Sequence, residues 1–144
     1  MAPLPSIRVL SLATIEQLPE NIRWGKERFT LLLAWDAPTA DNTQLRGWMR
    51  PLANGGLVYF CAWGDRCEAV HDAVDWCDIE KNGARSDFVI MTAWHKNESL
   101  EEACWFFKEL ALPNETGDIQ SFDRFAIAVN NTQCAEKMKE YFFS

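Results

Sequence analysis

The stretch that decides the fold is LLLAWDA, Leu31–Ala37, because two similar stretches follow it along the chain. They are YFCAWGD at Tyr59–Asp65 and IMTAWHK at Ile90–Lys96. In each, an apolar run reaches Ala-Trp and then changes to a small, charged or imidazole residue. Strands that are apolar on almost every residue are typical of a parallel sheet whose two faces are both covered.

Amphipathic segments separate these runs and have the spacing of helices. Alternating strands and helices predict a three-layer α/β sandwich with a mostly parallel sheet of four or five strands, flavodoxin-like or Rossmann-like. The predicted strands are Arg28–Trp35, Leu57–Trp63, Asp87–Trp94 and Arg124–Asn131. The predicted helix N-caps are Asp65, with Glu68 completing a capping box, Ser99 with Glu102, and Thr132.

The first 28 residues differ from the rest of the chain. They hold three of the six prolines and predict a leader with at most one short strand, Ile7–Leu12, followed by a loop. Residues 29–144 are then a single α/β domain. The start of the chain lacks the pattern of a signal peptide, and no apolar run approaches the roughly 20 residues of a membrane span. Five cysteines without a CxxC pair favour reduced thiols and a cytoplasmic location.

The charge and the missing motifs exclude several classes of protein. The net charge is −7 and the basic residues are scattered, so we expect no nucleic-acid partner. The chain has no GxGxxG, GxSxG or GK[ST] motif, which argues against a standard dinucleotide dehydrogenase and a P-loop nucleotide hydrolase. We expect no cofactor and no membrane partner, while a small anion held by helix N-termini stays open.

Polar groups follow the predicted strands, at the edge where parallel α/β sheets bind ligands. We expect a ligand-binding rim at this edge, with three tryptophans at one reused structural position. The alternative is that each tryptophan closes the top of the core. The expected rim residues are Trp35, Trp63, Gly64, Trp94 and Asn130, with Asp36 and Asp65 among them.

Four residues of this rim are candidates for catalysis, namely His95, Cys67, Asp36 and Asp65. Cys67 lies in the first turn of a helix, where the dipole favours a thiolate, and His71 and Asp75 follow at four-residue intervals as a possible base and orienting group. The opposing interpretation is that Cys67 belongs to the apolar stripe of this helix.

His95 is the second candidate site. Just past a strand and close to Glu98, Glu101 and Glu102, it has the setting of a general base or a metal ligand. The glutamates also have a simpler role, since acidic side chains stabilise a helix N-terminus. No metal-ligand spacing is present, so we predict no metal site. As a loop residue at a rim, His95 should carry little packing.

The helix LEEACWFFKEL places Trp105, Phe106 and Phe107 consecutively, so at least one of them must face solvent or a partner. An exposed aromatic patch on an acidic chain is typical of an interaction face, for a protein partner or for self-association. A wide core face is the alternative.

Two segments, AWGDRCEAVHDAVDW and MTAWHKNESLEEACWFFKEL, resemble a family of short uncharacterised bacterial proteins, a domain of unknown function with AWG…C…DW and TWH…LEE…WF blocks. The resemblance covers roughly residues 29–130. It implies a bacterial, cytoplasmic protein and transfers no mechanism. The positions that it marks for testing are Trp63, Gly64, Cys67, Asp75, Trp76, Trp94, His95 and Glu102.

Two functions follow from these observations. The first is a non-enzymatic acidic binding module that recognises a protein partner, in an immunity or regulatory role. The second is a small enzyme or ligand-binding domain with its site at the C-terminal edge of the sheet. A concave pocket lined by His95 and Asp36 would favour the second, and a rim closed by tryptophans would favour the first.

Overall fold

The computed structural model describes residues 4–22, 28–83, 89–113 and 121–143. Five parallel strands form one sheet in the order β1-β5-β2-β3-β4. The α/β fold class is therefore confirmed, and the strand order reverses between β2 and β5. The strands are β1 Ile7–Leu12, β2 Phe29–Ala34, β3 Leu57–Trp63, β4 Met91–Trp94 and β5 Asp123–Val129.

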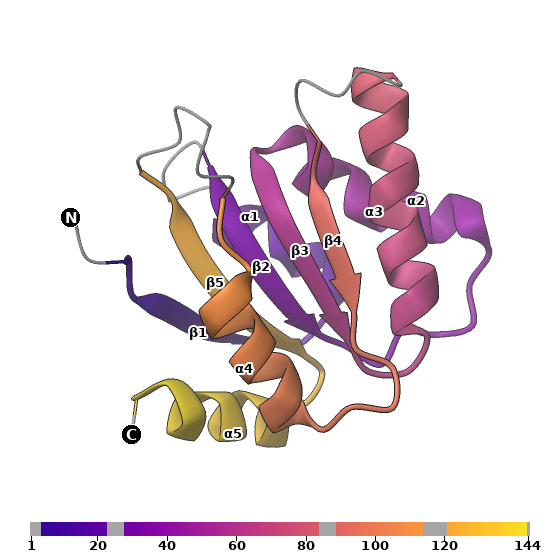
Figure 1. The fold of residues 1–144 in the computed structure, drawn as a ribbon. Helices are drawn as coiled ribbons and strands as arrows, with labels where there is room; N and C mark the ends of the chain where they lie inside the picture. Colours follow the sequence, from indigo (N-terminus) through magenta and orange to yellow (C-terminus); the bar gives the residue numbers. More distant parts are fainter. Residues whose placement is uncertain (1–3, 23–27, 84–88, 114–120, 144) are drawn as a thin grey trace.

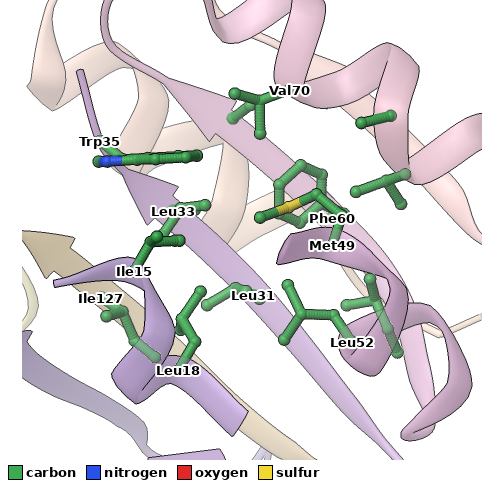
Figure 2. Close-up of a cluster of buried hydrophobic side chains, with 14 of the residues drawn as sticks. Ile15, Leu18, Leu31, Leu33, Trp35, Met49, Leu52, Phe60, Val70 and Ile127 are labelled. Carbon is green, nitrogen blue, oxygen red and sulfur yellow. The ribbon is translucent and has the colours of Figure 1, made fainter. Parts of the chain in front are cut away.

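Helices cover both faces of the sheet (Figure 1). One face is covered by α2, α3 and the short helices η1 and α1. The apolar side chains of these four helices belong to one core cluster. Figure 2 shows that Trp35, Leu33 and Leu31 of the central region pack there against Met49, Phe60 and Ile15. On the other face α4 and α5 form a second cluster. The helical elements are η1 Ile15–Gln17, α1 Leu18–Ile22, α2 Asn42–Asn54, α3 Cys67–Asn82, α4 Leu100–Leu110 and α5 Thr132–Phe143.

The apolar runs have different surroundings in the sheet. β2 and β5 are buried at every residue, as expected of central strands with both faces covered. β4 is an edge strand, and Met91 and Trp94 are about half exposed. Full burial was therefore the wrong expectation for this run, because an edge strand has a sheet neighbour on one side only. The predicted start of this strand, residues 87 and 88, lies outside the described residues.

The N-terminal 22 residues contain more structure than one strand and a loop. β1 pairs with β5, and η1 and α1 follow it. Leu18 and Ile22 of α1 are buried in the larger core cluster. The helix is only five residues long and contains Pro19, so it has too few turns to show an amphipathic period.

Two predicted N-caps are wrong by one residue, and one is right. Arg66, in a left-handed conformation (φ 62°), precedes α3 without a side-chain cap, so Asp65 is not the cap. Asn131, rather than Thr132, accepts the hydrogen bond from the Cys134 N–H group at the start of α5. Ser99 accepts from the Glu102 N–H group as predicted.

Within the described residues, no helix combines the length and the hydropathy that crossing a lipid bilayer would need.

Candidate functional site

A cavity of about 690 Å³ lies beyond the C-terminal ends of β2, β3 and β4. Asp36, His95, Cys67 and Asp65, the four candidate catalytic residues, all line it, together with Trp63 and Gly64. The turn after β4 and the first turn of α3 complete the wall. The structure therefore brings most of the predicted rim together around a concave site, which we call the rim cavity.

Gly64 and Asp36 build the floor of the rim cavity. Asp36 Oδ1 accepts a hydrogen bond from the Asp65 N–H group at 2.8 Å. Gly64 has φ +119°, and a Cβ atom there would lie 2.4 Å from the carbonyl oxygen of Trp35. Since β-carbon atoms do not approach carbonyl oxygens so closely, glycine is required where the ends of β2 and β3 meet.

Arg66 contributes a cation whose hydrogen-bonding groups are already engaged. Its guanidinium donates to the carbonyl oxygen of Pro38 at 2.6 Å and to that of Ala40 at 3.3 Å. These bonds tie the loop after β2 to the start of α3. The guanidinium therefore has fewer donors left for a ligand than a free arginine would have.

Cys67 does not form a catalytic triad with His71 and Asp75. Its side chain is only 3% exposed within the larger core cluster, and burial raises the pKa of the thiol. No hydrogen bond between Cys67 and His71 occurs in the described part of the chain. The thiol is therefore a core group whose thiolate is disfavoured, as the apolar-stripe interpretation holds.

His71 instead belongs to a polar cluster between α3 and the edge strand. Its Nδ1 lies 3.0 Å from Asp72 Oδ1, and its Nε2 lies 2.9 Å from Thr92 Oγ1, which donates to Asp75 at 2.8 Å. The ligand atoms of His71, Asp72 and Asp75 lie within 4.8 Å of one another, a spacing that could hold a metal ion. The two carboxylates, however, face opposite nitrogens of the ring. One ion could not replace both contacts, so the cluster is better suited to join α3 to β4.

His95 is buried, contrary to the expectation of a residue with little packing. It is 3% exposed, and its ring packs against Phe106 of α4 at a centroid distance of 4.9 Å. Its Nδ1 lies 3.0 Å from Glu98 Oε1, a contact in which the carboxylate accepts from an Nδ1–H group, and in that tautomer of the neutral ring Nε2 is an acceptor. Among the described residues Nε2 has no hydrogen-bond partner.

The three tryptophans do not occupy one reused position. Ala34 pairs with Trp63, and Ala62 pairs with Trp94, so the Ala-Trp dipeptide of each strand is shifted by one residue relative to that of the adjacent strand. Because side chains alternate along a strand, the shift turns successive tryptophans to opposite faces. Trp35 is buried in the larger core cluster, and half-exposed Trp94 packs against the ring of His71 in a tilted arrangement.

Trp63 is the tryptophan that lines the rim cavity, with its indole N–H donating to the Glu98 carbonyl oxygen at 2.9 Å. Asn130 does not line the rim cavity but a separate cavity of about 330 Å³, together with Trp35 and Asp36, which therefore lines both.

Sequence reasoning missed the acidic wall that α3 gives to the rim cavity. Glu68 and Asp72 both line it, and their four-residue spacing on a helix that starts at a strand end was the available signal. Glu98 also lines the cavity, whereas Glu101 and Glu102 do not.

A model of one protein family, described as Domain of unknown function (DUF7684), matches residues 7–144. The chain belongs to this family. The DUF7684 match includes β1 and so extends the expected resemblance, which covered residues 29–130, towards both ends of the chain. No curated protein matches this DUF7684 chain.

Proposed function

We propose that the protein is a non-enzymatic binding domain of the bacterial cytoplasm, and that its rim cavity holds a positively charged group. The observation that carries this proposal is the charge of the lining. The cavity wall contains five carboxylate side chains but only two cationic ones, Arg66 and Lys96. The carboxylates are Asp36, Asp65, Glu68, Asp72 and Glu98.

Hydrogen bonds engage groups of both signs. Arg66 is engaged by the carbonyl oxygens of the loop after β2, and three of the carboxylates have partners as well. The two that have no partner described above, Glu68 and Asp65, are exposed. A guanidinium or ammonium group entering there would meet several acceptors and few competing cations. The lining thus favours a cation over the anion that helix N-termini alone suggested.

The chemistry of the site supports binding rather than covalent catalysis. The thiol of Cys67 is buried, and its pKa is raised because burial penalises the thiolate. A cytoplasmic location agrees with five cysteines that are all reduced and buried.

A titration with arginine amide, followed by amide NMR, tests the proposal. We expect saturable shifts at Gly64 and Glu68 that weaken as salt is raised, and no such shifts with phosphate. Glu68→Gln should weaken binding about twofold to fivefold. The matched control is Glu101→Gln, which removes an exposed carboxylate from the first turn of α4 outside the cavity. Tighter binding of phosphate than of arginine amide would refute the proposal.

The same titration separates two sources of the cation. A blocked peptide with a central arginine presents the group as a partner protein would, and arginine amide presents it as a small molecule. Binding of the peptide alone would assign the site to a protein partner, in an immunity or regulatory role. Equal binding of both would assign it to a small amine.

A small enzyme acting at the same cavity is the second candidate, and His95 is the observation that favours it. Its Nδ1 is oriented by Glu98 while Nε2 has no partner among the described residues, which is the arrangement of an oriented general base. Turnover of an amine that binds the cavity, lost in His95→Gln with binding retained, would favour this function over the first.

A further inference from the structure

A third cavity, of about 290 Å³, lies at the opposite end of the sheet from the rim cavity. It is formed by the start of β1, the end of α4, the beginning of β5 and the end of α5. In Figure 1 these parts gather on the left, beside the two marked ends of the chain. The two cavities share no lining residue.

Arg124, the second residue of β5, is the unusual member of this cavity. It is only 3% exposed, yet no carboxylate lies within ion-pair distance of it among the described residues. A buried charge without a counter-charge is costly, and buried arginines are normally paired. Burial accordingly lowers the pKa of Arg124, partly offset by the nearby charge of Glu109.

The guanidinium of Arg124 is only partly satisfied. Nη2 donates to the carbonyl oxygens of Phe107 and Lys108 at 3.2 and 2.8 Å, which caps the end of α4. Nε is buried and has no acceptor in the described residues. The hydroxyl of Thr30, whose residue pairs with Arg124 in the register of β2 and β5, is also buried without a partner. An acceptor is thus missing beside a buried cation.

The rest of the cavity wall is mainly apolar. Phe142 and Phe143 of α5 and Leu4, Pro5 and Ile7 before and in β1 line it, and Phe143 is 61% exposed. Among the described lining residues, Lys108 adds a second cation, against the single carboxylate of Glu109. The site therefore combines a net positive charge with room for a small apolar group.

We propose that this cavity binds a carboxylate that carries a short apolar tail. A carboxylate offsets the buried charge of the Arg124 guanidinium, and one of its oxygens supplies the missing acceptor for the Nε–H group. The tail lies against Phe142 and Phe143. Such a carboxylate has two sources, a free short-chain acid or the C-terminus of a peptide that ends in an apolar residue.

NMR titration of the protein with hexanoate tests the proposal. We expect saturable shifts of the Arg124 Nε–H resonance and of the Phe143 amide. Hexan-1-ol and hexylamine have the same tail without the carboxylate, and we expect neither to cause these shifts. A tripeptide ending in phenylalanine, compared with its amide, tests the second source. Binding of the tripeptide and not of hexanoate would assign the site to a peptide terminus.

Three variants distinguish a loss of binding from a loss of folding. Lys108→Gln should weaken hexanoate binding about fivefold, and Phe143→Ser by a similar factor. Trp105→Ser is the matched control, because Trp105 is a half-exposed aromatic residue of α4 that does not line the cavity. Equal binding of hexanol and hexanoate, or unchanged affinity in both Lys108→Gln and Phe143→Ser, would overturn the proposal.

Discussion

Two opposing influences act on the thiol of Cys67. Its place in the first turn of α3 favours the thiolate through the helix dipole, whereas burial favours the neutral thiol. Burial is the larger influence, and the pKa is raised. The orientation of one side chain on its helix thus decides between a nucleophile and a small core residue, and the spacing along the sequence was compatible with both interpretations.

We expect Cys67 to react slowly with a thiol reagent in the native protein at pH 7. The thiol is buried and mostly protonated, and the other four cysteines are buried as well. Counting fast-reacting thiols with Ellman's reagent should therefore give a value near zero before denaturant is added. One rapidly reacting thiol that disappears in Cys67→Ser would contradict this expectation.

Gly64→Ala should destabilise the protein by about 2 kcal/mol or more, because the added Cβ would meet the Trp35 carbonyl and φ is +119°. Urea unfolding measures the change. The control is Gly47→Ala, where a Cβ has open space inside α2 and should stabilise the protein by roughly 0.5–1 kcal/mol. Equal stability of Gly64→Ala and the wild-type protein would show that the backbone at Gly64 can move away from the Trp35 carbonyl group.

At the scale of the elements, the helix starts show what the sequence could predict. Ser99 follows the rule for N-caps, since its hydroxyl accepts from the N–H group three residues later. Before α3 the same rule fails, since Arg66, in a left-handed conformation, occupies the cap position without a side-chain hydrogen bond. The preceding residue is held through its N–H group by Asp36, 29 residues away in sequence, and a local pattern contains no information about such a contact.

A pair of substitutions compares a helix start that has a side-chain cap with one that has none. Asp41 accepts a hydrogen bond from the Gln44 N–H group at the start of α2, so Asp41→Ala should cost about 1 kcal/mol of the free energy of unfolding. Asp65→Ala removes an exposed side chain without a capping role and should leave this free energy almost unchanged. Urea titrations of both variants give the comparison, and a similar loss in both would mean that Asp65 stabilises α3 after all.

At the scale of the whole molecule, the alternation of apolar runs and amphipathic helices was enough to predict an α/β sandwich. The strand order was not predictable, because every strand in such a sheet has a similar composition. The rim cavity was predictable in place, since strand C-termini share one edge. Its charge was not, because Glu68 and Asp72 reach it only through the orientation of α3.

The five buried thiols predict instability in alkali. Burial raises the pKa of each, that of Cys104 to about 12, so the folded state holds protons that the unfolded chain releases above pH 9. The contribution of the protonated thiols to the free energy of unfolding is therefore fully present below pH 9 and is lost as the pH rises above that value. At pH 10 we expect the loss due to Cys104 alone to be on the order of 1 kcal/mol.

Guanidinium unfolding of the wild-type protein and of Cys104→Ala at pH 7 and pH 10 tests this linkage. The variant is less stable at pH 7 but should lose less stability between the two pH values. An equal loss in both proteins would mean that Cys104 does not contribute to the effect.

The place of β5 in the sheet has a consequence for synthesis of the chain on the ribosome. β1 is made first, but its strand neighbour among the described residues is β5, which is made last of these five strands and separates β1 from β2. β2, β3 and β4 can pair with one another as they emerge, whereas the first strand must wait for the last. Until then the nascent chain exposes β1 and the open side of β2, and both are sites at which a chaperone could bind.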